Sequence, residues 1–148
     1  MPDTEDHAVG DRPTPSETVQ AVYEAINSRD FEAGFALLDE RFEWLEPDQT
    51  LLSGHHRGFE EVRRAIEMQL EVFDEFTIEP EEFHEYGERV AVPVRQRVRG
   101  GVSGVEIEVR IGHLWTVKAG KILRLEVFPA REDARHAAEL AERGERSD

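Results

Sequence analysis

The sequence contains no cysteine among its 148 residues. Disulfide scaffolds, thiol nucleophiles and cysteine-ligated zinc or iron–sulfur sites are therefore excluded. No apolar run reaches the roughly 18 residues that a membrane-spanning helix needs. Glycine-rich phosphate loops, nucleophile elbows and HExxH patterns are also missing. We therefore expect no cofactor and no membrane contact.

Basic residues are scarce relative to acidic ones: 18 Lys and Arg face 33 Asp and Glu, a formal net charge of −15. Such a surface repels phosphate backbones, so we expect no nucleic-acid partner. The opening segment MPDTEDHAVG is acidic and polar, unlike a secretory signal. These features predict a soluble cytoplasmic protein whose partner is a neutral or cationic small molecule.

The length suits one domain, with no room for a separate cofactor domain. Residues 1–13 are rich in Asp, Glu and Pro and lack an apolar period, which predicts a disordered acidic tail. Residues 144–148 have the same character. We expect a single domain over residues 14–143.

Helical patterns dominate the first half of the chain. Thr14, Pro15 and Glu17 match an N-cap, an N1 proline and a capping-box glutamate, so a helix is predicted from Pro15 to about Ser28. Asp30 is placed to cap a second, short helix. A third helix is predicted from Phe59, and the apolar face expected for it comprises Phe59, Val62, Ile66, Leu70 and Phe73.

Strand patterns dominate the rest. Residues 41–46 alternate and stop at Pro47, and a polar loop is expected over 48–58. Strands are predicted over 76–86, 90–98, 105–117 and 121–127, with a flexible connection over 100–104. Lys118–Gly120 suits a three-residue hairpin loop, which would pair Val117 with Lys121 and set Trp115 beside Leu123. A final helix over 131–143, with an alanine stripe, should pack weakly.

The outer face of the long hairpin alternates in charge. Arg97 and Arg99 can lie opposite Glu108 and Glu106. One interpretation is a solvated cross-strand ladder in which each pair contributes at most about 1 kcal/mol. The other is a homodimer interface on this outer face.

Four stretches together resemble a known superfamily: VYEAINSRD (Val22–Asp30), FEWLEP (Phe42–Pro47), SGHHRGFEE (Ser53–Glu61) and HLWTVKAGKILRL (His113–Leu125). With the order of elements, they make residues 15–140 similar to the nuclear transport factor 2-like superfamily. Within it the chain most resembles SnoaL-like domains, which include polyketide cyclases, and ketosteroid isomerases. The resemblance implies an α+β fold: a cone-shaped, strongly curved antiparallel or mixed sheet wrapped round three helices, with a hydrophobic pocket at its open end.

Glu46 is the first candidate for chemistry. It ends a predicted strand before Pro47, and the resemblance places the catalytic aspartate of ketosteroid isomerases in the same strand-end context. A carboxylate in an apolar pocket has a raised pKa and can move a proton beside a carbonyl. The alternative is an exposed loop acid.

Donors for the developing oxyanion are the second requirement. Tyr23 lies near the position where the resembling isomerases carry a tyrosine donor. His113 breaks the apolar face of a central strand, and could donate to a carbonyl or act as a general acid. Gln96 makes a similar inward break. Each of the three could instead be a core residue whose polar atoms are satisfied locally.

Other candidates form walls of the pocket. Trp44 and Trp115 are expected to face inward, and His56 is expected at the pocket mouth. Adjacent histidine side chains at positions 55 and 56 diverge, so we expect no metal site. Epoxide hydrolases of this fold use inward-facing ionisable groups. The matching positions here are Val94, Gln96 and Val127, which argues against that activity.

Two functions therefore remain open. One is a cofactor-independent isomerase, cyclase or dehydratase that acts on a small apolar carbonyl compound, with Glu46 as base. The other is a non-catalytic domain of the same fold that binds a hydrophobic small molecule.

Overall fold

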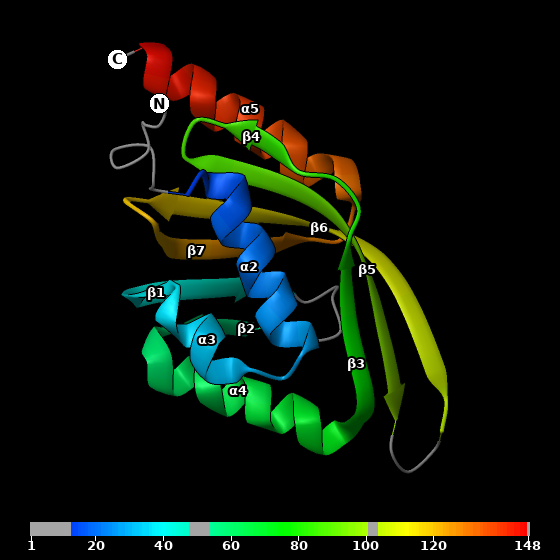
Figure 1. Ribbon diagram of the computed structural model, residues 1–148. Coiled ribbons are helices and arrows are strands. Elements are labelled where there is room, and N and C mark those ends of the chain that lie inside the picture. The colour runs from blue at the N-terminus through cyan, green and yellow to red at the C-terminus, as the bar shows by residue number, and fades with distance from the viewer. Residues whose placement is uncertain (1–12, 48–53, 101–103, 148) are drawn as a thin grey trace, which may run out of the picture.

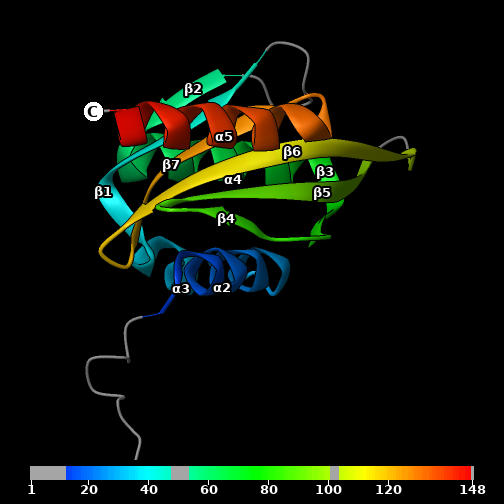
Figure 2. The ribbon, with the colours of Figure 1, turned by 90° about the horizontal axis from the view of Figure 1, so that it is seen from above.

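A computed structural model describes residues 13–47, 54–100 and 104–147. A strongly curved mixed sheet holds three helices, α2, α3 and α4, in its concave side, while the last helix, α5, crosses the opposite face (Figures 1 and 2). The strand order is β2-β1-β7-β6-β5-β3, and β4 pairs with β5. The predicted α+β architecture is confirmed. No helix in these ranges is both long and apolar enough to cross a membrane. The tail predicted over 1–13 lies almost wholly outside the described residues.

The N-terminal helix α2 spans Pro15–Asn27, as the capping signals predicted. The Thr14 hydroxyl accepts from the Glu17 N–H, and the Glu17 carboxylate accepts from the Thr14 N–H in return. Helix α3 spans Phe31–Ala36, and the Asp30 carboxylate caps it at Ala33. These caps satisfy backbone N–H groups that the first turns leave free.

Strand β1 (Leu38–Glu46) is three residues longer than predicted and pairs with two neighbours. It runs parallel to β7 (Lys121–Phe128) and antiparallel to β2 (Gly54–Arg57). The sequence predicted a loop here, and that was wrong for the residues of β2. The polar segment GHHR has no apolar alternation, so backbone pairing with β1 alone makes it a strand. The rest of the predicted loop, 48–53, lies outside the described residues.

Helix α4 (Gly58–Val72) begins one residue earlier than predicted and buries less of its apolar face. Only Val62 is fully buried, while Ile66 is half-buried and Phe59 and Leu70 are 38% and 40% exposed. Ile66 and Leu70 line the cavity described below rather than a packed core. The helical period indicated the right face but not that this face borders open space.

The strand predicted over 76–86 is two strands, β3 (Phe73–Pro80) and β4 (His84–Tyr86). Proline has no N–H for a ladder, so β3 ends there. Both pair with β5 (Arg89–Gly100), which in turn pairs with β6 (Glu106–Lys118). The predicted cross-strand neighbours are confirmed: Arg97 lies opposite Glu108, and Arg99 opposite Glu106. Residues 101–103 of the predicted connection are not described.

The β6–β7 hairpin has a different register from the predicted one. Ala119 (φ 53°) and Gly120 (φ 80°) form a two-residue loop, so Lys118 pairs with Lys121 and Val117 with Ile122. Two successive left-handed residues are the pattern of a type I′ turn, which suits strand twist. A bulge then sets Trp115 opposite Leu125. Ile122 is fully buried as a result, whereas Leu123, expected on the inner face, is only half-buried.

The end of α2 is fastened to the free edge of β3. The Asn27 amide donates to the Ile78 carbonyl at 2.7 Å and accepts from the Ile78 N–H at 3.0 Å. The Arg29 guanidinium donates to the Phe76 carbonyl at 2.7 Å. These bonds cover an edge that would otherwise expose unpaired backbone groups. They also fix α2 over the concave face.

Helix α5 (Arg131–Ser147) crosses the outer face of β5 and β6 (Figure 2). Ala134 and Ala138 are 1% and 0% exposed and pack with Ala91 and Leu114 in a second small core. The alanine stripe therefore allows close approach to the sheet, where we had expected weak packing. The helix also continues through most of the tail predicted over 144–148.

Gly112 on β6 permits this close approach, because a Cβ there would lie 2.9 Å from both the Ala134 Cβ and the Arg131 carbonyl oxygen. We predict that Gly112→Ala lowers the free energy of unfolding by about 1–3 kcal/mol through overpacking. Gly144→Ala is the matched control: nothing lies within 4 Å of its added methyl, and helix propensity favours alanine. Urea unfolding of both variants tests this, and equal effects would contradict it.

Candidate functional site

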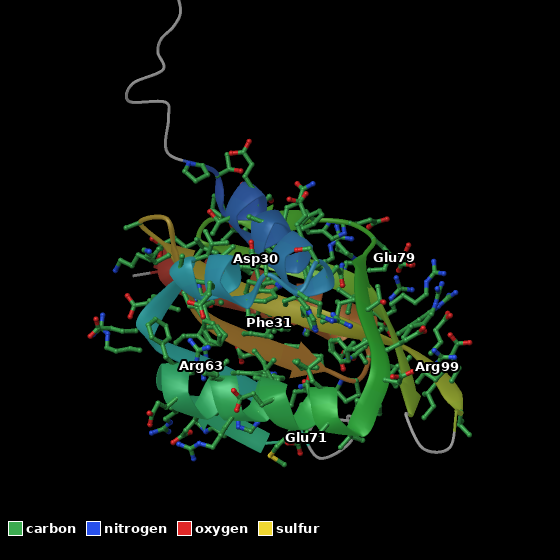
Figure 3. The ribbon with its side chains drawn as sticks, turned by 60° about the horizontal axis from the view of Figure 1, so that its bottom comes forward. Asp30, Phe31, Arg63, Glu71, Glu79 and Arg99 are labelled. Carbon is green, nitrogen blue, oxygen red and sulfur yellow. The ribbon has the colours of Figure 1, made fainter. Side chains whose placement is uncertain are left out.

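A cavity of about 110 Å³ lies between the concave face of the sheet and helices α2, α3 and α4. Its walls are mostly apolar side chains, and α3 contributes Phe31 (Figure 3). Asp30 and Arg29, both exposed, also line it, so the cavity reaches the surface beside the α2–α3 turn. An apolar cavity of comparable size can hold a benzene ring. The space suits a small ring compound.

Strand register places the candidate residues in two rows on the inner face. Trp44 pairs with Leu125, which pairs with Trp115, so the two indoles flank one leucine. Two residues further along the strands, His113 pairs with Val127. Glu46 lies at the end of β1, one residue beyond the pair of Leu45 and Glu126, and so flanks Val127 on its other side. Side chains two residues apart share a face, and Glu46 and His113 both line the cavity.

A buried hydrogen-bond chain joins α2 to β6. The Trp115 indole N–H donates to the Tyr23 hydroxyl oxygen at 2.8 Å, and that hydroxyl lies 2.7 Å from Nδ1 of His113. Burial raises the pKa of Tyr23 well above its usual value, so the phenol stays protonated. Tryptophan can only donate, and among the described residues Nδ1 is the acceptor within reach of the hydroxyl proton. We therefore assign the Tyr23 proton to the bond with Nδ1.

This chain sets the state of the His113 imidazole. Burial lowers the pKa of His113 to about 3, so the ring is neutral near pH 7. Because Nδ1 accepts from Tyr23, the single ring proton resides on Nε2. Across the described ranges, Nε2 makes no hydrogen bond to the protein, and the side chain lines the cavity. His113 thus offers the cavity one N–H donor.

Glu46 is held by its neighbour on the same strand. Its carboxylate accepts from the Trp44 indole N–H at 3.2 Å, and its side chain lines the cavity. On its far side, Trp44 contacts the His56 ring, with centroids 5.0 Å apart. His56 on β2 is the cross-strand neighbour of Trp44, and it is not among the residues that line the cavity. Burial lowers the pKa of His56.

Two buried amides complete the polar lining. Gln96 on β5 is 5% exposed, and Gln69 on α4 is 8% exposed. Both line the cavity. The inward break in the strand pattern indicated Gln96, whereas Gln69 was not predicted. The signal for Gln69 was present, since it interrupts the apolar helical face of Val62 and Ile66 at the seven-residue position.

The chain matches the SnoaL-like domain family over residues 19–125. It belongs to that family. No curated protein matches it significantly. An NTF2-like protein of unknown function from Burkholderia pseudomallei is 30% identical, with a TM-score of 0.71, over 83% of this chain and 97% of that one. NTF2-like denotes the nuclear transport factor 2-like superfamily.

Two further solved structures are similar to this SnoaL-like domain. TerC, co-crystallised with polyporic acid, is 26% identical with a TM-score of 0.70, over 84% of this chain and 98% of that one. SalBIII, described as an epoxide hydrolase/cyclase-like enzyme with a role in pyran ring formation in polyether salinomycin, is 20% identical. Its TM-score is 0.67, over 77% of this chain and 88% of that one. At that identity the likeness shows the fold alone.

The SnoaL-like fold thus brings six of the seven predicted site residues to one cavity. They are Tyr23, Trp44, Glu46, Gln96, His113 and Trp115. His56 is the exception. No three His, Asp or Glu side chains gather as a metal site within the residues that the structure describes.

The buried imidazole makes stability depend on pH. Unfolded His113 takes up a proton below its usual pKa of 6.5, while the folded residue does so only near 3. The contribution of neutral His113 to the free energy of unfolding is therefore complete above pH 6.5. It is lost as the pH falls towards 3, at up to about 1.4 kcal/mol per pH unit. We predict that His113→Gln reduces the loss of unfolding free energy between pH 6.5 and 5.

Urea unfolding at several pH values measures this slope. The control is His136→Gln, because His136 is exposed on α5. This variant should keep the wild-type dependence of unfolding free energy on pH. An unchanged slope in His113→Gln would show that His113 is not the group responsible.

Proposed function

We propose that this SnoaL-like domain is a cofactor-independent enzyme that moves a proton beside the carbonyl group of a small apolar compound, as an isomerase, cyclase or dehydratase. The observation that carries the proposal is the row containing Glu46 and His113. A carboxylate and an N–H donor flank Val127 in neighbouring strands and line the same cavity. Two strand spacings separate their backbones by about 10 Å, which leaves room for a substrate between the side chains.

In the proposed reaction the Glu46 carboxylate removes a proton from the carbon next to the carbonyl. Negative charge then develops on the carbonyl oxygen, and the His113 Nε2–H donates a hydrogen bond to it. Glu46 returns the proton to the substrate at a second atom, so the carboxylate is regenerated. The apolar walls exclude water and strengthen both interactions.

The neutral imidazole defines the role of His113. With a pKa of about 3, the ring does not carry the extra proton that a general acid would give up near pH 7. It acts instead as a hydrogen-bond donor. Tyr23 is then a positioning residue, because its hydroxyl donates its hydrogen bond to Nδ1 of His113. This differs from the direct donor role that the resemblance to ketosteroid isomerases implied for Tyr23.

The relatives support occupation of the cavity by a small organic molecule. TerC was co-crystallised with polyporic acid, and it aligns with 84% of this chain. SalBIII shows that the same fold occurs in a cyclase-like enzyme.

Deuterium exchange at the carbon next to the carbonyl of 2-tetralone, an enolisable ring ketone, tests the proposal. We expect the wild-type protein to accelerate exchange and Glu46→Gln to reduce the rate at least about 100-fold, in line with loss of a general base. Glu43→Gln is the matched control, because Glu43 lies on the same strand but outside the cavity lining. Equal rates in wild type and Glu46→Gln would contradict the assigned base.

A second function, binding without catalysis, is favoured by one observation. The Tyr23 hydroxyl is engaged inside the core, so one fewer donor is available to an oxyanion than the resemblance implied. A pure binding domain would be thermally stabilised by 2-tetralone without exchange, and Glu46→Gln would leave that stabilisation nearly unchanged. The same two measurements therefore distinguish the functions.

We also propose a homodimer through the outer face of the sheet. Helix α5 covers part of that face (Figure 2), and the remainder carries alternating charges, with Arg97 3.4 Å from Glu108 and Arg95 3.3 Å from Glu81. A surface with both signs interspersed can complement a second copy of itself.

Sedimentation velocity tests the dimer. We expect a dimer at low salt that dissociates in Arg97→Glu, because like charges would then meet across the interface. Arg64→Glu on α4, exposed and outside that face, should leave the dimer intact. A wild-type monomer at every protein concentration would contradict the proposal.

A further inference from the structure

The two glutamines of the cavity have side-chain amides that no protein group of the described ranges engages. Gln96 and Gln69 are at least nine-tenths buried. Neither side-chain amide has a hydrogen-bond partner within the part of the chain that the structure describes, and both side chains line the cavity. Buried amides normally find partners, because leaving them unpaired is unfavourable. Neither amide is among the fully enclosed polar atoms without a partner, so both are open to the cavity. Water or a ligand in the cavity supplies their hydrogen bonds.

The glutamines line the cavity from two different elements, a strand of the sheet and helix α4. Gln96 projects from β5, and its backbone pairs with that of Ile78 in β3. Gln69 projects from α4, one turn before that helix passes directly into β3. Ile78 itself lines the cavity. Both residues therefore lie on elements that adjoin β3.

This side lies apart from the proposed reacting groups. His113 pairs with Val92 on β5, and Gln96 is four residues further along that strand. Four residues of extended chain span about 13 Å. Glu46 lies further away across the sheet, on β1. Side chains from both places reach into the same cavity, so a ring compound that contacts both carries its polar groups at opposite ends.

The chemistry of the amides limits the group that they can bind. Each amide supplies two N–H donors and a carbonyl acceptor without charge. A hydroxyl, which both donates and accepts, matches them better than a carboxylate, which would meet amide oxygens. The Arg29 guanidinium also lines the cavity, and it donates to the carbonyls of Ile26 and Phe76 at the exposed α2–α3 turn. The site therefore favours an uncharged group.

We propose that Gln69 and Gln96 form a second polar subsite that selects substrates bearing an uncharged hydroxyl at the end remote from the reacting carbonyl. The substrate class is then a small, otherwise apolar hydroxy ketone with its hydroxyl and carbonyl at opposite ends. This rests on the proposed function for the position of the reacting carbonyl. The subsite itself depends only on the two buried amides and their place in the cavity.

Two matched probes test the subsite, 2-tetralone and 6-hydroxy-2-tetralone, which differ by a hydroxyl across the ring system from the ketone. Both indoles that border the cavity, Trp44 and Trp115, serve as fluorescence reporters of Kd. We expect the wild-type protein to bind the hydroxy ketone about 10-fold more tightly, the effect of about 1.4 kcal/mol from a well-placed hydrogen bond.

Gln96→Met removes the amide with little change in volume. It should abolish this preference, because the hydroxy ketone would bind more weakly and 2-tetralone more tightly. Gln69→Met gives an independent second variant. Gln20→Met, on the exposed side of α2, is the control and should retain the wild-type preference. A third probe carrying a carboxylate in place of the hydroxyl should bind more weakly than 2-tetralone.

The outcomes separate the subsite from catalysis. Equal Kd values for the two ketones in wild type, or a preference that survives in both cavity variants, would overturn the subsite and indicate that the amides bind only ordered water. Failure of the hydroxy ketone to bind would also overturn it. Loss of deuterium exchange with an intact hydroxyl preference would overturn the proposed enzyme while leaving the subsite supported.

Discussion

The hydrogen-bond chain Trp115–Tyr23–His113 is the interaction on which the rest of the site depends. It connects α2 to β6 through two short bonds in a fully buried setting. Tryptophan can only donate, the buried tyrosine stays protonated, and Nδ1 is the acceptor within reach of its proton among the described residues. These three facts assign the direction of each hydrogen bond in the chain. The result is a neutral imidazole with a fixed tautomer, which turns a core residue into a donor at the cavity wall.

The cavity exists because the concave sheet is not filled by the helices. Two sets of hydrogen bonds hold α2 over the sheet. One is the buried chain through Tyr23, and the other joins Asn27 to the edge of β3. Helix α4 packs against β1, β2 and β3 and presents Ile66 and Gln69 to open space. The apolar face of α4 is partly exposed because it forms one wall of the cavity. A tightly packed core would bury these residues and leave no room for a ligand.

Local signals predicted much of the fold because each acts over a few residues. The Thr14–Glu17 capping box located α2, and two-residue alternation placed Arg97 opposite Glu108. The β6–β7 hairpin was misregistered because Lys118–Gly120 is compatible with both a two- and a three-residue loop. Strand pairing and a bulge favour the two-residue loop. As a result Ile122 is buried in the core, in place of Leu123.

The sequence alone determined the SnoaL-like family and the polar residues available to a pocket, Glu46, His113 and Gln96 among them. Both rest on local patterns and residue chemistry. Only the tertiary structure decided what those residues face. Whether Tyr23 donates to a ligand or to His113, and whether Gln69 lies in a core or a cavity, depends on contacts between segments far apart in the chain. Periodicity identifies a buried face, but not what that face meets.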